Sequence, residues 1–208
     1  MLNIFARASV SRVTDPIGQA LVRAGLTPNA MTVFGTVGAV ICALVFIPND
    51  LLLWGTFTVW GFAMLDVLDG AMARARGYGT PFGAVLDATC DRLVDGALFA
   101  AIAWWAFVRD DNHPAAAAAL ACLVLAQVTS YVKARADASG LPVDGGLVER
   151  AERLIIALVG TGLHGFGIPY TVDVTLWLLV VLSAITLLQR IFAVAKAARE
   201  AKAEGTPS

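Results

Sequence analysis

Long apolar segments separated by short polar connections are the main feature of the chain. Six such segments cover residues 31–47, 51–73, 84–108, 115–132, 154–168 and 174–195. Because roughly 20 consecutive apolar residues cross the hydrocarbon core of a bilayer as a helix, each segment predicts a membrane-spanning helix. The fifth segment is short and rich in glycine, so its outer end is the least defined of these boundaries.

The composition agrees with this pattern. Of the 208 residues, 58% are hydrophobic and 15% are charged, and the mean hydropathy is +0.74. Soluble domains have about 25% charged residues. The three cysteines are an odd number and lie in apolar segments, so they do not predict a disulfide framework. The predicted fold class is therefore an all-α integral membrane protein with six transmembrane helices.

The basic residues predict how the bundle is oriented. If the N-terminus is cytoplasmic, all of the 15 Lys and Arg residues except Arg109 lie at the cytoplasmic ends of the segments. Cytoplasmic loops of membrane proteins carry such an excess of Lys and Arg. We therefore expect an even number of spans, with both termini in the cytoplasm.

We expect a single membrane domain over residues 1–208. Residues 28–198 would form the bundle and residues 199–208 a cytoplasmic tail. Residues 1–27 mix apolar side chains with Arg7, Arg12 and Arg23, which is typical of an amphipathic helix lying in the membrane interface. A partly ordered arm is the alternative for this segment.

Four aspartates lie close to one end of the second and third segments. Asp66 and Asp69 are three residues apart, and Asp87 and Asp91 are four apart, so each pair shares one face of its helix. Ionisable side chains inside spans are costly and indicate a functional site. Carboxylates are the ligands that hard divalent cations such as Mg²⁺ prefer, and two ions would balance four aspartates. The alternative is simple ion pairing of these aspartates with nearby arginines.

The spacing of these residues resembles the signature of the CDP-alcohol phosphotransferase family. The motif reads Asp66-x2-Asp69-Gly70-x2-Ala73-Arg74-x8-Gly83-x3-Asp87-x3-Asp91. The resemblance implies a six-helix bundle that acts as a homodimer. It also implies a reaction in which an acceptor hydroxyl attacks the phosphorus of a CDP-linked lipid and expels CMP. We therefore expect a multi-pass protein of the bacterial plasma membrane with its active site on the cytoplasmic side.

The resemblance also implies roles for individual residues. Asp66, Asp69 and Asp87 would bind Mg²⁺, with two ions per site, or Mn²⁺, and Asp91 would be both a metal ligand and the general base. The donor CDP-diacylglycerol would be bound by Asn29, Ala30, Met31, Thr32, Gly70, Arg74 and Thr80. Residues 27–32 also form a predicted helix start, where free backbone N–H groups suit anionic ligands. Plain capping of that helix is an equally good interpretation of the same six residues.

Basic residues outside the motif bear on the acceptor. Arg190 lies within the sixth apolar segment, where a guanidinium needs an anionic partner such as a phosphate. Residues 130–135, 141–146 and 149–153 resemble the branch of the family that uses inositol 1-phosphate and makes phosphatidylinositol phosphate. The expected acceptor-phosphate residues are Ser130, Lys133, Arg135, Arg153 and Arg190. We attribute Arg150 to the orientation of the bundle and Asp95 to a structural polar contact, for example with Arg92.

Two alternative functions remain at this point. A sibling enzyme would use glycerol 3-phosphate as acceptor and make phosphatidylglycerophosphate. A divalent-cation transporter would use intramembrane aspartates to line an ion path, but the outer halves of the segments are nearly all apolar. The expected partners are the two substrates, membrane lipid and a second copy of the chain, and no nucleic acid.

Overall fold

The described part of the protein is entirely helical. The computed structural model describes residues 14–77, 79–141, 143 and 145–203, and within these no strand occurs. The helices with full bounds are α2 (Pro28–Phe46), α3 (Leu52–Ala75), α4 (Pro81–Val108), α5 (His113–Ala138), α6 (Arg150–Gly165) and α7 (Thr171–Ala203). Each of them overlaps one of the six predicted segments, and together they confirm the all-α class.

The ends of the helices differ from the apolar segments. α5 and α7 continue past their apolar parts into basic sequence, as far as Ala138 and Ala203. Residues 199–203 of the predicted tail therefore belong to α7. At the other end of the chain, residues 14–23 of the predicted arm are helical, whereas Arg7, Arg12 and the rest of residues 1–13 lie outside the described residues.

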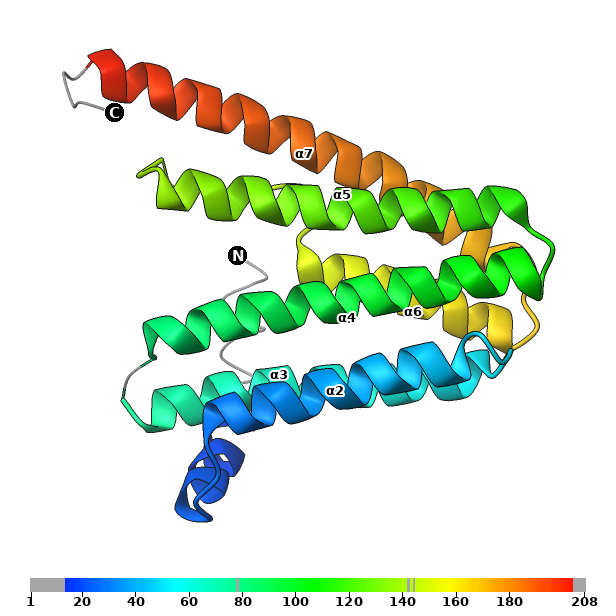
Figure 1. Cartoon of the computed structure of the whole chain (residues 1–208), viewed down its shortest axis with the longest axis horizontal. Coiled ribbons are helices and arrows are strands. Elements are labelled where there is room, and N and C mark those ends of the chain that lie inside the picture. Colours follow the sequence, from blue (N-terminus) through cyan, green and yellow to red (C-terminus); the bar gives the residue numbers. More distant parts are fainter. Residues whose placement is uncertain (1–13, 78, 142, 144, 204–208) are drawn as a thin grey trace.

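The helices form one elongated bundle (Figure 1). α2 packs against α3 and α4, α5 packs against α4 and α7, and α6 packs against α3 and α7. α5 presents a face of fully buried alanines to its neighbours, namely Ala115, Ala118, Ala119 and Ala126. At Gly160 of α6 an added Cβ would lie 1.9 Å from the Thr175 hydroxyl of α7. Small residues thus allow these helix backbones to approach closely.

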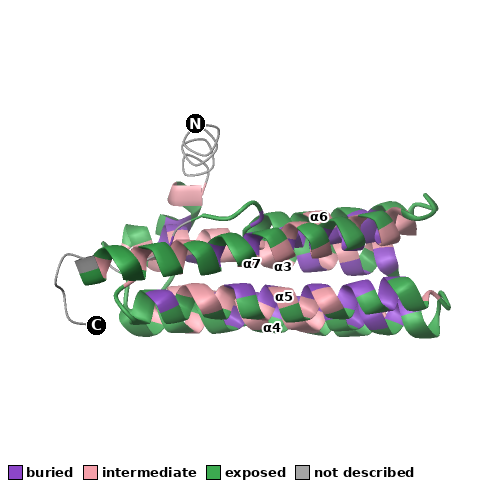
Figure 2. Cartoon of the chain, turned by 90° about the horizontal axis from the view of Figure 1, so that it is seen from above, coloured by how far each residue is buried: buried purple, intermediate pink, exposed green. Residues whose placement is uncertain are grey.

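The outer faces of the helices are exposed along much of the bundle (Figure 2), and large apolar side chains lie among these exposed residues. Large exposed side chains include Phe34, Trp54, Phe57, Trp104 and Phe192. A soluble monomer rarely exposes so much contiguous apolar surface. This surface, together with the apolar helices beneath it, is that of an integral membrane protein.

Four helical segments of the described chain are long and apolar enough to cross a bilayer. They are Pro28–Asn49, Leu52–Ala75, His113–Ala138 and Thr171–Lys202. α4 carries Asp87, Asp91, Arg92 and Asp95, which lower its hydropathy. α6 has only 16 residues, or about 24 Å of helix, against about 30 Å of hydrocarbon. The expectation of six spans therefore depends on the placement of α4 and α6.

Candidate active site

Three of the four aspartates of the motif come together at one end of the bundle. Oxygens of Asp66, Asp69 and Asp87 all lie within 4.8 Å of one another. α3 and α4 are antiparallel and joined by the short connection 76–80, so the last turns of α3 face the first turns of α4. Three converging carboxylates offer the hard oxygen ligands that divalent cations prefer, so these residues fit such an ion.

Asp69 is held by a residue of the first long helix. The Thr32 hydroxyl of α2 donates a hydrogen bond to the Asp69 carboxylate, and both side chains are buried. Thr32 was expected to contact the donor substrate. Its observed partner indicates that it orients a carboxylate of the cluster, a contact that only the packing of α2 on α3 creates.

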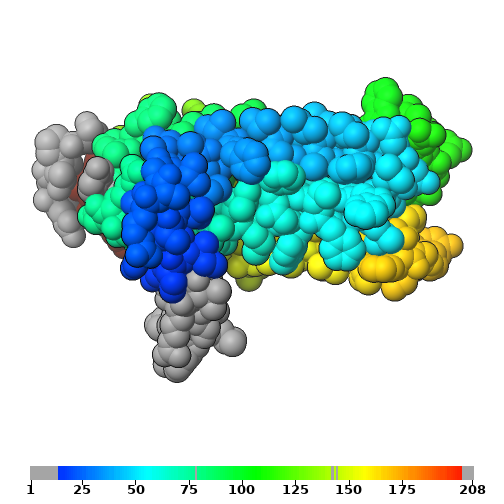
Figure 3. All heavy atoms as spheres, turned by 90° about the horizontal axis from the view of Figure 1, so that it is seen from below, coloured from blue at the N-terminus to red at the C-terminus, as the bar shows by residue number. Residues whose placement is uncertain are grey.

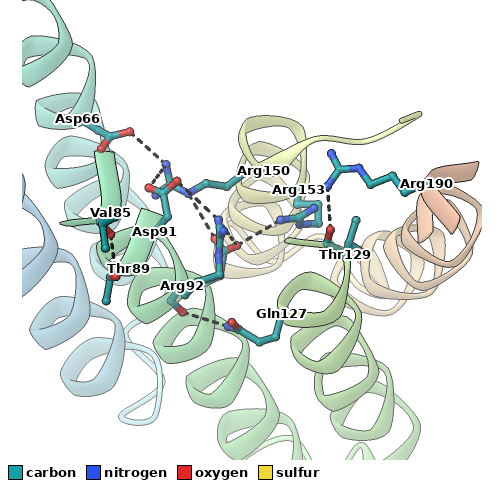
Figure 4. A network of polar contacts seen from close by, with 11 residues as sticks. Asp66, Val85, Thr89, Asp91, Arg92, Gln127, Thr129, Arg150, Arg153 and Arg190 are labelled. Carbon is teal, nitrogen blue, oxygen red and sulfur yellow. Dashed lines mark hydrogen bonds and ion pairs between the residues drawn. The ribbon is translucent and has the colours of Figure 1, made fainter. Parts of the chain in front are cut away.

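Asp91 does not join the cluster of three carboxylates but faces Arg150 at the start of α6 (Figure 4). Nη1 of Arg150 lies 2.7 Å from Oδ1 of Asp91 and 3.1 Å from Oδ2 of Asp66. Arg92, the neighbour of Asp91 in sequence, lies farther away, at 3.6 Å. Arg150 therefore does more than orient the bundle, and the sequence alone did not predict this contact. Its position three residues before Arg153, on one face of the same helix, is the signal that could have revealed it.

Asp95 lies one helical turn after Asp91 in α4, and three arginines surround its carboxylate. Its carboxylate is 2% exposed and lies 3.4 Å from Nη2 of Arg153, which is 3% exposed. Arg150 and Arg92 approach it to 3.8 Å and 4.0 Å. The expected contact with Arg92 is thus present, but Arg153 is the closer partner. Because a buried charge is tolerated only when it is paired, Asp95 accounts for the burial of Arg153.

Arg190 is buried, and its donors contact the backbone. Its Nε donates to the carbonyl of Gly145 at 3.1 Å and its Nη1 to the carbonyl of Thr129 at 2.9 Å. Arg190 also lines a hollow of about 340 Å³ formed with residues of the α5–α6 connection. Arg135 lines a separate hollow together with Tyr131 and Ile191. The structure therefore does not bring Arg135 and Arg190 together.

A hollow lies beside the carboxylates, between the starts of α2 and α4. It measures about 690 Å³ and includes Asp69 and Asp87 in its wall. Both helices begin with Thr-Pro, and the hydroxyls of Thr27 and Thr80 each accept a backbone N–H of the first turn. Two helix N-termini thus border one hollow, an arrangement that favours anionic groups.

Four of the seven expected donor-binding residues line this hollow. They are Asn29, Thr32, Gly70 and Thr80, and Arg76 joins them. The other three expected residues, Ala30, Met31 and Arg74, are not among the described residues that line it. Arg74 instead forms an ion pair of 2.9 Å with Asp15 in the helix 14–23. That helix lies against the bundle near the start of α2 (Figure 3).

A family profile described as CDP-alcohol phosphatidyltransferase matches residues 25–188. The chain belongs to this family. The resemblance seen in the aspartate motif is thereby confirmed, and the protein is a transferase. The matched residues contain α2 to α6, the part of α7 up to residue 188, and the four aspartates of the motif together with Asp95.

Proteins named phosphatidylinositol phosphate synthase are similar to this chain over most of its length. A phosphatidylinositol phosphate synthase of Mycobacteroides abscessus is 51% identical over 195 residues, covering 93% of this chain and 89% of that protein. The protein of the same name from Mycobacterium tuberculosis is 50% identical over 196 residues, covering 93% and 90%.

Crystal structures of the Mycobacterium tuberculosis phosphatidylinositol phosphate synthase resemble this transferase closely. One, with CDP-DAG bound, has a TM-score of 0.84 at 51% identity and covers 88% of this chain and 94% of that chain. Another, in complex with manganese and citrate, has a TM-score of 0.83 at 51% identity and covers 87% and 88%. The carboxylate cluster of this chain has the ligand chemistry that a divalent metal requires.

Proposed function

We propose that this transferase moves the phosphatidyl group of CDP-diacylglycerol to inositol 1-phosphate, giving phosphatidylinositol phosphate and CMP. The observation that carries the proposal is an identity of 50–52% to phosphatidylinositol phosphate synthases over 93% of the chain. The residues around the aspartate cluster are consistent with each part of this reaction.

The metal is assigned to the four aspartates of the motif. Asp66, Asp69 and Asp87 hold one Mg²⁺ or Mn²⁺, for which their oxygens are already close enough. A second ion is shared with Asp91, across the space between α3 and α4. When bound, the metal neutralises the negative charge that develops on the phosphate oxygens during transfer.

The donor is assigned to the hollow of about 690 Å³. The N-termini of α2 and α4 face its phosphates, and Gly70 leaves room for them beside the carboxylates. The residues proposed for the donor are Asn29, Ala30, Met31, Thr32, Gly70, Arg74 and Thr80. Arg74 exchanges its ion pair with Asp15 for a phosphate oxygen, a small cost because exposed ion pairs contribute about 0–1 kcal/mol.

Asp91 is assigned as the general base. Its carboxylate removes the proton from the acceptor hydroxyl, whose oxygen forms a bond to the lipid-linked phosphorus. The bond between that phosphorus and the CMP oxygen breaks, and CMP leaves. A carboxylate can act in this way when it lies within hydrogen-bond reach of the hydroxyl. Asp91 lies at the boundary between the other aspartates and the arginines, where such a hydroxyl is expected.

The acceptor phosphate is assigned to the arginine side of the site. Arg153 and Arg190 place two buried guanidinium groups on α6 and α7. Arg190 uses two of its donors on backbone carbonyls and orients the α5–α6 connection. Ser130 and Lys133 belong to the adjoining face of α5, and Arg135 remains at the rim in its separate hollow. Planar guanidinium groups bind the oxygens of a phosphate monoester well. They therefore favour an acceptor that carries a phosphate over one that does not.

The membrane arrangement completes the proposal. All six helices α2–α7 cross the plasma membrane of a bacterial cell, with both termini and the aspartates on the cytoplasmic side. The helix over residues 14–23 lies in the interface, and two chains form a homodimer. The support for this orientation is the concentration of Lys and Arg at the end of the bundle that carries the motif.

A comparison of acceptors tests the proposal. The purified protein in detergent is supplied with CDP-diacylglycerol and Mg²⁺, and CMP release is measured with inositol 1-phosphate, glycerol 3-phosphate or free inositol. We expect CMP release with inositol 1-phosphate only, and none in the Asp91→Asn variant. Faster release with glycerol 3-phosphate would contradict the assigned acceptor. No release with any acceptor would contradict the assignment of CDP-diacylglycerol as the donor.

A further inference from the structure

Arg150 occupies the space between two carboxylates that the proposed function assigns to metal. A single nitrogen, Nη1, contacts Asp91 at 2.7 Å and Asp66 at 3.1 Å (Figure 4). The contact joins α6 to both α3 and α4, and the Arg150 side chain is only 22% exposed. This guanidinium therefore bridges the same pair of carboxylates that a second ion would bridge.

A guanidinium and a divalent cation compete for these oxygens. Each binds carboxylates by charge, and two cations cannot occupy one site between Asp66 and Asp91 at the same time. Nη1 of Arg150 donates a hydrogen bond to Asp66, and hydrogen bonds between charged groups are stronger than those between neutral ones. An ion that binds both aspartates must therefore displace the guanidinium of Arg150.

The surroundings of Arg150 offer a second place for its charge. Its Nε lies 3.8 Å from Oδ1 of Asp95, the buried carboxylate one turn deeper in α4. Arg150 is also the first residue of α6. The preceding connection contains Gly145 and Gly146, both at positive φ. Asp95 thus offers the Arg150 guanidinium a carboxylate partner when an ion takes its place at Asp66 and Asp91.

We propose that Arg150 is a positioning residue that exchanges with the second divalent cation at Asp66 and Asp91. The cluster of Asp66, Asp69 and Asp87 accepts the first ion, and the second ion enters only by displacing Nη1 of Arg150. Before that exchange, Nη1 of Arg150 bridges Asp66 and Asp91. After it, Arg150 rests on Asp95, beside Arg153 and the proposed acceptor phosphate. Binding of the second ion would thus move Arg150 towards the arginines proposed to bind the acceptor phosphate.

Arg92 offers a matched comparison. It also lies near Asp91 and Asp95, at 3.6 Å and 4.0 Å. Unlike Arg150, it has no contact with Asp66 within the described ion pairs, and it belongs to α4 itself. Removal of either arginine removes one positive charge from the same region, but only the loss of Arg150 clears the space between the two carboxylates.

The experiment measures Mn²⁺ binding directly, without substrate and without turnover. Titration of the full-length protein in detergent is followed by the electron paramagnetic resonance signal of free Mn²⁺, for the wild type, Arg150→Met, Arg150→Lys and Arg92→Met. Elution as a single species and an unchanged helical circular dichroism spectrum show that each variant is folded. In the wild type we expect one tight site and one weaker site.

Arg150→Met should tighten the weaker site by about tenfold or more, since loss of a charged hydrogen bond of 1.4 kcal/mol corresponds to a factor of ten. Arg150→Lys should give an intermediate affinity, and Arg92→Met a smaller gain. Unchanged or weaker binding in Arg150→Met would overturn the exchange, and so would an equal gain in Arg92→Met. This inference depends on the proposed metal site, and a wild type without any Mn²⁺ binding would instead contradict that site.

Discussion

The guanidinium of Arg153 lies 3.4 Å from the carboxylate of Asp95, and neither side chain is more than 3% exposed. The pair joins α6 to α4 in the interior of the bundle, directly behind the motif aspartates. Removing either charge would leave the other buried without its partner, which strongly destabilises a folded protein. The pair therefore supports the active site from within the bundle.

The first prediction concerns this pair. Asp95→Asn should destabilise the protein by about 3–5 kcal/mol, because it leaves the buried charge of Arg153 without its closest partner. The double variant Asp95→Asn with Arg153→Met should recover part of that loss, although it removes an acceptor residue. Thermal unfolding in detergent measures both. Asp111→Asn, at a position 95% exposed at the opposite end of the bundle, serves as the control and should leave the unfolding temperature unchanged.

The second prediction concerns Thr32 and Asp69. Thr32→Val keeps the shape of the side chain but removes the hydroxyl that donates to the Asp69 carboxylate. Hydrogen bonds to charged groups contribute about 1.5–3 kcal/mol. We expect Mn²⁺ to bind the tight site about tenfold more weakly, with a matching rise in the metal concentration needed for CMP release. Thr32→Ser should restore both values, and an unaffected Thr32→Val variant would show that Asp69 needs no such support.

The third prediction separates the base from the metal ligands. Asp91→Asn should lower kcat by at least about 10²-fold, the contribution expected from a positioned proton acceptor. It should keep the tight Mn²⁺ site, because Asp66, Asp69 and Asp87 remain in place. Asp69→Asn should lose that site as well as the activity. Loss of the tight site in Asp91→Asn would indicate that all four aspartates bind as one unit.

The fourth prediction tests the close approach of α6 and α7. Gly160→Ala would place a Cβ 1.9 Å from the Thr175 hydroxyl, and such overpacking costs about 1–3 kcal/mol. Adding Thr175→Ala should relieve the clash and restore the unfolding temperature. The matched control is Gly61→Ala in α3, where an added Cβ meets nothing within 4 Å. That change should be neutral or stabilising by up to about 1 kcal/mol, because alanine favours the helix.

The helices and the grouping of the aspartates were predictable because both depend on local spacing. Long apolar segments become helices wherever they lie in the bundle, and residues three or four apart on a helix share a face. The short connection 76–80 then makes α3 and α4 antiparallel neighbours, so Asp66, Asp69 and Asp87 meet. The short length of α6 and the charged residues of α4 could also be seen in the sequence. Six spans were nevertheless expected, whereas four described segments are long and apolar enough to cross a membrane.

The partners of the charged side chains were not predictable in this way. Helices that are apolar on nearly all sides carry no pattern that indicates how each is rotated or which neighbour it meets. Arg150 could therefore be explained by orientation alone, and Arg135 could be grouped with Arg190 although the two line separate hollows. Thr32 likewise has a buried partner 37 residues away in sequence.

Local sequence is therefore sufficient for the order of the helices, the family motif and the end of the bundle that carries the carboxylates. The contacts of Arg150 with Asp66 and Asp91, and of Arg153 with Asp95, join α6 to α3 and α4. Where α6 packs on α3, an added Cβ at Gly162 or Gly165 would lie 3.1 Å from Thr56 or 3.0 Å from Leu53, so these glycines let the two helices approach closely. Side-chain packing between distant segments, rather than spacing along the chain, brings the arginines to the aspartates.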